Sequence, residues 1–245
     1  MTLNLRHLIH ARFLAALLFL LTVPFVVFAA SLPRLPDGGK VESIGAFTEA
    51  GASEALKKAL EPKGYRVSTA DGTVLCDIWL RNGIATGKNE SLGVAYKWIG
   101  DSALVAVITI PKATTDFRRQ PLKAGSYTLR YGIHPQDGNH LGISPIRDFL
   151  LLTPLADDQT PDAKITFEDL NKMSKKASGT NHAAPMSLVS TDGITAWPSV
   201  IEDENGHLVF AAKVKTASGS ESPIAFVVKG VVETAANTNL SLLSQ

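Results

Sequence analysis

Short apolar or alternating segments recur along this chain roughly every 10 to 20 residues, separated by turns rich in Gly, Asp and Asn. Successive side chains of a strand point to opposite faces, so such segments predict strands with one or both faces buried. No stretch long enough for a crossover helix separates them, which argues against a parallel α/β sheet. The sequence therefore predicts an all-β fold, an antiparallel β-sandwich of immunoglobulin-like or transthyretin-like type with two short helices.

The expected strands lie at 65–69, 73–81, 92–99, 103–110, 126–133, 148–153, 186–190, 195–201, 207–216 and 223–233. Asp71-Gly72 and Asn205-Gly206 each separate two of them, and both dipeptides are typical of two-residue hairpin turns. Ser53 is predicted to cap a helix at 54–61, and Thr166 a second helix that ends at Gly179.

The N-terminus predicts export. Arg6 and Arg12 precede an apolar run from Phe13 to Phe28, and small residues around Ala29 suit a signal peptidase. An uncleaved anchor is the alternative, but the run is shorter than the roughly 20 residues of a spanning helix. We therefore expect a signal peptide at 1–29, no stable membrane anchor after cleavage, and a location in the periplasm or extracellular space. The rest divides into a flexible lead-in (30–43), the sandwich domain (44–234) and a disordered tail (235–245).

The charge of the chain argues against an electrostatic partner. It has 24 basic and 23 acidic residues, and removing Arg6 and Arg12 leaves 22 minus 23, or −1. A near-neutral chain without a basic cluster is not typical of nucleic-acid binding. The single cysteine, Cys76, lies in the alternating run 73–81 on the same face as Val74, Ile78 and Leu80, which predicts a small buried hydrophobe.

One loop could bind a metal. If the chain reverses through Asp137-Gly138, then His134 and His140 face each other with Asp137 at the tip, and His182 could join from a distance. Two imidazoles and a carboxylate suit zinc or copper. The favoured alternative is a turn shaped by proline and glycine, with its polar side chains in solvent.

A second candidate site consists of charged residues near the same loop. Arg147 and Asp148 precede a buried strand and could bind an anionic or hydroxylated ligand together with Arg130 and Asp137. The alternative is internal pairing, in which Arg147 or Arg130 bridges Asp148 or Asp116. The acids at 157, 158 and 162 are expected on a polar surface loop.

The sequence nominates no catalytic residues. It has no G-x-S-x-G elbow for a serine hydrolase, and its carboxylates are too scattered to nominate a glycosidase pair. Trp79, Trp98 and Trp197 lie in expected strands, where tryptophan is more often part of the core than a platform for sugar rings.

The block Tyr127-Thr-Leu-Arg-Tyr131, with Asp137-Gly-Asn-His140-Leu-Gly142 and Arg147-Asp-Phe-Leu-Leu-Leu152, is distinctive. It resembles a group of exported bacterial proteins of unknown function that share a Y-T-L-R-Y, D-G-x-H-x-G, R-D-F-L-L-L core. The preceding A-G-x-Y-x-L element is also similar to a strand entry of many transthyretin-like and immunoglobulin-like sandwiches. The resemblance implies export and a sandwich fold, and it implies no activity.

We therefore expect a non-catalytic binding or interaction module of the periplasm or cell surface. Its ligand would engage the end of the sandwich that carries the 134–147 loop, because sandwiches place recognition on such loops. The expected partner is an envelope protein, a glycan or a peptide, without a cofactor. The alternative is a zinc or copper protein, possibly enzymatic, that uses the histidine loop.

Overall fold

The computed structural model describes residues 38–117, 119–135 and 146–230, all of which belong to the compact unit Pro33–Gln245. The expected signal peptide and disordered tail lie outside the described residues. In chain order the elements are β1 (Gly39–Ile44), α1 (Glu54–Ala59), β2 (Gly64–Thr69), β3 (Val74–Leu80), β4 (Asn82–Ile84), β5 (Leu104–Ile110), β6 (Thr114–Thr115), β7 (Pro121–Leu122), β8 (Gly125–Ile133), β9 (Asp148–Pro154), the 3-10 turn η1 (Leu155–Asp157), α2 (Phe167–Ser178), β10 (Pro185–Ser187), β11 (Ser199–Glu202), β12 (Leu208–Thr216) and β13 (Glu221–Lys229).

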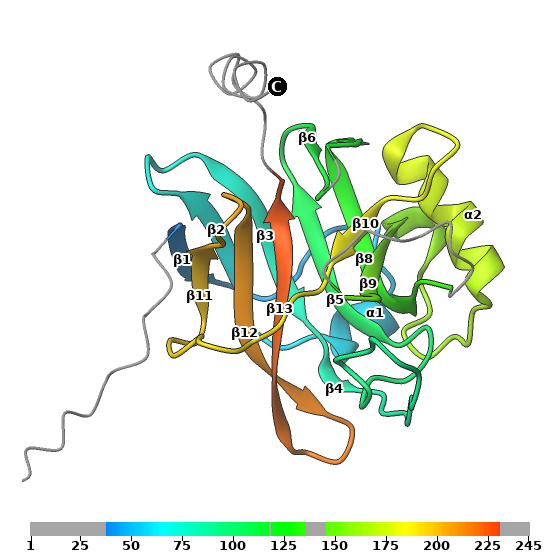
Figure 1. The fold of residues 1–245 in the computed structure, drawn as a ribbon. Coiled ribbons are helices and arrows are strands. Elements are labelled where there is room, and N and C mark those ends of the chain that lie inside the picture. Colours follow the sequence, from blue (N-terminus) through cyan, green and yellow to red (C-terminus); the bar gives the residue numbers. More distant parts are fainter. Residues whose placement is uncertain (1–37, 118, 136–145, 231–245) are drawn as a thin grey trace, which may run out of the picture. The chain divides into compact units, whose positions relative to one another are not determined.

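Two packed sheets make up most of the fold, and β6 and β7 form a separate two-stranded sheet. The larger one has the order β1-β2-β3-β5-β8-β9-β10, and each neighbouring pair is antiparallel. The smaller one contains β11-β12-β13, with β4 parallel to β12. Figure 1 shows β12 and β13 crossing in front of the larger sheet. The prediction of an all-β, largely antiparallel sandwich is confirmed, and the choice between immunoglobulin-like and transthyretin-like stays a prediction.

The main core lies between the two sheets. Cys76, Ile78 and Leu80 of β3 face it from the larger sheet, and Phe210 and Phe226 face it from the smaller one. In β3 the residues that face this core are spaced two apart, as the alternation of a strand requires. Strands β12 and β13 each contain five consecutive buried residues, because an apolar cluster also covers their other face. Cys76 is 2% exposed, and burial raises the pKa of its thiol. The prediction that Cys76 is a small buried hydrophobe is confirmed.

The opposite face of the larger sheet is covered by α1, η1 and α2. Leu56 of α1 packs with Trp79 of β3, while Leu170 of α2 packs with Phe149 and Leu151 of β9. Strand β8 runs between these two apolar clusters, because it separates β5 from β9 in the sheet. Polar side chains of β8 that face this side are therefore buried beneath a loop.

Both helices start where the sequence indicates and α2 also ends there, whereas α1 ends at Ala59, two residues before the predicted end at Glu61. The Ser53 hydroxyl accepts from the Leu56 N–H, and the Thr166 hydroxyl accepts from the Asp169 N–H. Gly179 ends α2 with φ +70°, a left-handed conformation that glycine adopts at little cost. The hairpins at Asp71-Gly72 and Asn205-Gly206 connect β2 to β3 and β11 to β12. The predictions of the helix caps and of the two hairpins are confirmed.

The predicted strand at 92–99 is wrong. In its place the chain forms turns, with Gly93 at φ +74°. The Ala95 and Tyr96 N–H groups donate to the Asp148 carboxylate, at 2.8 and 2.9 Å, instead of to a neighbouring strand. A carboxylate distant in sequence thus takes the backbone donors that a β-ladder would use.

The lead-in predicted for 30–43 is wrong for its described part after Gly38. Residues from Gly39 onward form β1, which pairs with β2 and places Val41 opposite Val67. The prolines and glycines that indicated a loose segment end at Gly39, and the residues after it alternate in burial as an edge strand does.

The three tryptophans belong to the packed parts of the molecule. Trp79 is 9% exposed, and its indole N–H donates to the Gly45 carbonyl at 2.8 Å. Trp98 and Trp197 are half-buried and pack against apolar clusters. The prediction that tryptophan serves the core is confirmed.

Candidate functional site

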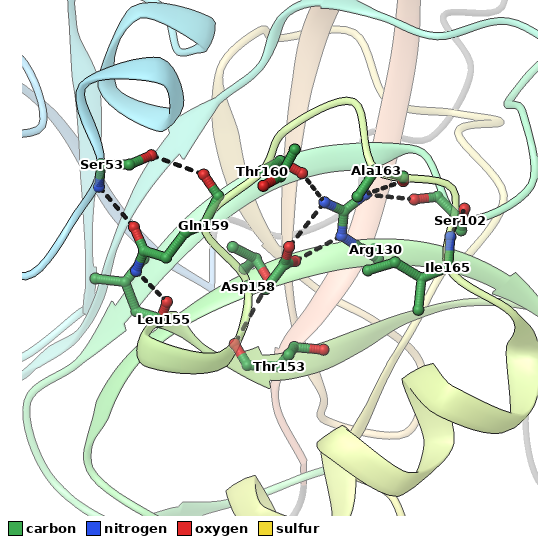
Figure 2. Close-up of polar contacts among 11 residues, drawn as sticks. Ser53, Ser102, Arg130, Thr153, Leu155, Asp158, Gln159, Thr160, Ala163 and Ile165 are labelled. Atoms are coloured by element: carbon green, nitrogen blue, oxygen red, sulfur yellow. Dashed lines mark hydrogen bonds and ion pairs between the residues drawn. The ribbon is translucent and has the colours of Figure 1, made fainter.

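Arg130 of β8 and Asp158 form an ion pair beneath the loop that follows η1. Their side chains are 1% and 2% exposed. The guanidinium Nε and Nη2 donate to the two carboxylate oxygens at 2.5 and 2.8 Å (Figure 2). Thr128, on the same face of β8, donates its hydroxyl to the same carboxylate at 2.6 Å. A fork-to-fork pair of this kind fixes both position and orientation.

The other donors of Arg130 also stay within the chain. Nη1 donates to the carbonyls of Ser102 at 2.8 Å and Ala163 at 3.3 Å, and Nη2 donates to the Thr160 carbonyl at 2.7 Å. All five guanidinium N–H groups therefore have acceptors. The prediction that Arg130 contacts a ligand is corrected, because no donor is left for one. Its carboxylate partner is Asp158, from the expected surface loop, and neither Asp148 nor Asp116.

The same loop is tied to the start of α1. The Ser53 N–H donates to the Gln159 side-chain oxygen at 2.6 Å, and the Ser53 hydroxyl donates to the Gln159 carbonyl at 2.7 Å (Figure 2). The Gln159 amide also donates to the carbonyls of Gly51 and Leu155. Residues 158–165 are thus held over β8 by the Arg130 pair on one side and by α1 on the other.

Asp148 is structural as well. It is 0% exposed, and besides the two N–H groups of the 92–99 segment it accepts from the Tyr131 hydroxyl at 2.6 Å. Burial raises the pKa of Tyr131, and the hydrogen bond to the Asp148 carboxylate acts in the same direction. The prediction that Asp148 binds a ligand is corrected, because its oxygens hold backbone and phenol groups in place.

Arg147 is half-buried and donates to two backbone carbonyls. Nε and Nη2 donate to the His134 carbonyl, and Nη1 donates to the Leu92 carbonyl at 2.8 Å. The alternative of internal satisfaction therefore holds for Arg147, although the acceptors are carbonyls and not carboxylates. Its side chain nevertheless lines one of the clefts described next.

Two adjoining clefts open beside this buried network. The first measures about 450 Å³ and lies between Arg81, the turn before β5 and the 161–165 loop. The second measures about 470 Å³ and lies between Asn89, the end of β8 and the start of α2. Asp101, Ser102 and Ile165 line both clefts, so these residues mark where the two adjoin.

Ser102 has an unusual backbone conformation. Its φ of 55° lies in the left-handed region, which costs a non-glycine residue about 1–2 kcal/mol. Its carbonyl accepts from Arg130, and its hydroxyl accepts from the Ile165 N–H at 3.2 Å (Figure 2). The Arg130 network thus fixes the turn that carries Asp101 into both clefts.

The first cleft contains polar groups that the described chain leaves unused. Arg81 donates from Nε to the Gly83 carbonyl and from Nη2 to Asp162, but its buried Nη1 has no acceptor among the described residues. The Asp101 carboxylate and the Lys164 ammonium are exposed and make no hydrogen bond or ion pair within the described parts of the chain. The sequence did not single out Arg81, Asp101 or Lys164, because they come from separate segments.

The metal hypothesis involves four residues, of which the structure describes two. His134 lies at the end of β8, where its ring packs on Phe149 with 4.2 Å between centroids. His182 is exposed on the loop after α2. Asp137 and His140 lie outside the described residues, so zinc or copper binding at this loop stays a prediction. Within 38–117, 119–135 and 146–230, no three His, Cys, Asp or Glu side chains gather as a metal site.

Comparison of the chain with protein-family models, with curated proteins and with solved structures gave no match. The resemblance to the exported bacterial group therefore stays a prediction. None of the described helices is long and apolar enough to cross a membrane.

Proposed function

We propose that the protein is an exported, non-catalytic binding module whose ligand occupies the two adjoining clefts. The single observation that carries this proposal is that the first cleft contains polar groups without partners among the described residues: the exposed Asp101 carboxylate and Lys164 ammonium, and the buried Nη1 of Arg81. Buried donors without acceptors are uncommon in folded proteins, and a binding site is one setting that explains them. The volumes of the clefts lie in the usual range for small-ligand sites.

The scaffold supports binding. The walls of the clefts come from β5, β8 and the start of α2, which are held by the sheet ladder, the Thr166 cap and the Arg130 network. Groups fixed in this way lose little conformational entropy when a ligand binds. The Ser102 turn gains the same rigidity from its two hydrogen bonds.

The residue types support binding over catalysis. The titratable groups that line the first cleft are the carboxylates of Asp101 and Asp162 and the cations of Arg81, Lys164 and Arg130. Neither cleft has a histidine or a cysteine among its described lining residues. Histidine, the side chain that most often acts as a general base near neutral pH, is thus missing from the described walls.

Cleft-filling variants test the site. Ala85 and Ser91 are exposed residues that line the first and the second cleft, so Ala85→Trp and Ser91→Trp should block them without disturbing the core. Ala50 lies in an exposed turn and lines neither cleft, which makes Ala50→Trp the matched control. Binding to glycan and peptide arrays should be lost in the first two variants and retained in the control. Equal binding by all three would contradict the proposed site.

Export has its own test. Cell fractionation followed by N-terminal sequencing should find the chain in the envelope or medium, beginning near Ala30. A cytosolic chain that retains residues 1–29 would contradict export without bearing on the clefts.

A further inference from the structure

We infer that the two clefts bind a neutral oligosaccharide, with Asp101 as the hydroxyl acceptor shared by both clefts and Arg81 as a donor in the first. This inference rests on the proposed function, because it names the ligand class of the same site. It follows from the charge balance of the walls, from the kinds of unused group, from the apolar part of the second cleft and from the strands on which the clefts lie.

The charges of the first cleft cancel. Arg130 is neutralised by Asp158, which leaves the cations of Arg81 and Lys164 opposite the carboxylates of Asp101 and Asp162. The second cleft adds one cation, Arg147, whose donors are engaged by carbonyls that hold the guanidinium in place without cancelling its charge. A ligand with a net charge of either sign would meet as much repulsion as attraction in the first cleft. A neutral ligand that both donates and accepts hydrogen bonds fits this wall better.

The unused groups complement hydroxyls. A carboxylate accepts through two oxygens, so Asp101 can receive protons from two neighbouring hydroxyls of one sugar ring. The Arg81 Nη1 lacks an acceptor among the described residues and is itself buried in the wall of the cleft, so it donates to a hydroxyl or ring oxygen only when the Arg81 side chain turns toward the cleft. Hydrogen bonds that involve a charged partner are about twice as strong as neutral ones, so these two groups should dominate binding.

The second cleft adds an apolar wall. Phe167 is 41% exposed and lines this cleft together with Ile133 and Leu170. A sugar ring has hydroxyls around its edge and C–H groups on its faces, so it can place an edge on Asp101 and a face on Phe167. The second cleft therefore offers a carboxylate for the hydroxyls of the ring and an aromatic side chain for its C–H groups.

The position of the clefts disfavours an extended peptide. Peptides that bind to sheets usually add a strand at an edge, where main-chain donors and acceptors are unpaired. The clefts lie instead over β5 and β8, which are interior strands with partners on both sides. Recognition must therefore use side chains, as it does for sugars.

The experiment is calorimetric titration of protein purified after expression of the full chain. The probes are neutral trisaccharides (maltotriose, cellotriose, xylotriose and N-acetylated chitotriose), trigalacturonate as the anionic counterpart, and uncharged and charged tripeptides. At least one neutral trisaccharide should bind, and its affinity should hardly change between about 0.05 and 0.5 M salt, because screening acts only between charges.

Two variants report on the assigned groups. Asp101→Asn and Arg81→Ala should each weaken binding of that trisaccharide by about 10- to 100-fold, the effect of losing a charged hydrogen bond. Their controls are Asp192→Asn, in another exposed turn, and Arg66→Ala, an arginine of β2 whose side chain is 43% exposed, because neither residue lines either of the two clefts. Should Arg81→Ala fail to fold, Asp101→Asn decides alone.

The outcomes separate the two proposals. Binding of trigalacturonate or a tripeptide, but of no neutral trisaccharide, would overturn the oligosaccharide inference. The proposed function would still stand if Ala85→Trp or Ser91→Trp abolished that binding. Trisaccharide binding that is unchanged in Asp101→Asn would overturn the assigned roles. If no probe binds, the oligosaccharide inference fails. If a ligand found by the arrays binds equally well to both tryptophan variants, the proposed site fails as well.

Discussion

Arg130, under the 158–165 loop, and Arg81, in the wall of the first cleft, lie in adjoining regions. Both are arginines, but their hydrogen bonding differs. Arg130 is 1% exposed and bonds to one carboxylate and three carbonyls. Arg81 has an 11% exposed side chain, pairs with an Asp162 that is 76% exposed, and keeps one nitrogen without an acceptor among the described residues. The two arginines are therefore similarly buried. They differ in their acceptors, because the described chain supplies one for every N–H group of Arg130 but not for the Nη1 of Arg81. The first arrangement holds a fold together, and the second leaves capacity for a ligand.

The largest expected difference is in stability. Arg130→Ala should lower the free energy of unfolding by about 3–5 kcal/mol, because it leaves the Asp158 carboxylate buried without its partner. Arg81→Ala should cost only about 1 kcal/mol, since its partner is largely in solvent. Urea unfolding followed by tryptophan fluorescence measures both. Equal losses in the two variants would contradict the comparison.

Replacement of the buried Asp148 should likewise cost more stability than replacement of the exposed Asp101. Asp148→Asn should destabilise the fold by about 1.5–3 kcal/mol. The Asp148 carboxylate accepts from three donors through two oxygens, whereas an amide has only one oxygen that can accept. Asp101→Asn should change stability by no more than about 0.5 kcal/mol, as is usual for an exposed side chain. Melting temperatures of the two variants, each beside the parent protein, test this. A less stable Asp101→Asn than Asp148→Asn would be inconsistent with the assigned roles.

A smaller effect should be seen at alkaline pH. Burial raises the pKa of Tyr131 and of Tyr96, so above about pH 10 the folded state retains protons that the unfolded chain releases. Stability is therefore fully present below that pH and falls as the pH rises further. In Tyr131→Phe the fall per pH unit should be shallower, although the variant starts less stable because it lacks the hydrogen bond to Asp148. Urea midpoints at neutral and alkaline pH decide this, and an unchanged pH dependence would count against the buried phenol.

The smallest expected effect concerns metal. The proposed ligand site contains no metal-binding cluster among its described residues, and the His134 ring packs against Phe149. Treatment with EDTA followed by dialysis should therefore leave the melting temperature and trisaccharide affinity unchanged. The metal hypothesis would instead be favoured if the protein contained stoichiometric zinc or copper and lost stability when EDTA removed it. A His134→Ala, His140→Ala double variant should then retain less metal.

Local sequence patterns predicted the elements that local physics determines. Ser53, Thr166 and Gly179 cap helices through contacts within a few residues, and Asp71-Gly72 sets a hairpin through its own backbone geometry. Cys76 was correctly placed in the core because alternation in β3 reports burial directly. Segment 92–99 was missed because its backbone donors bond to Asp148, more than 50 residues later.

The candidate site was less predictable for the same reason. The sequence nominated Arg130 and Asp148 either as ligand contacts or as internally paired residues, but it could not show that both are satisfied inside the fold. Arg81 lies between β3 and β4, whereas Asp101 lies in the turn before β5, and the pairing of β3 with β5 brings both to the wall of the first cleft. The Gly100-Asp101-Ser102 turn between two predicted strands was the one local signal for the cleft.

The most direct test of the account is a spectrum of the arginine side chains. In protein labelled with ¹⁵N-arginine, the Arg130 guanidinium hydrogens should exchange slowly with solvent and keep their shifts when a binding trisaccharide is added, while the Arg81 resonances should shift. Shifts at Arg130 with none at Arg81 would contradict the division of roles on which the proposed site depends.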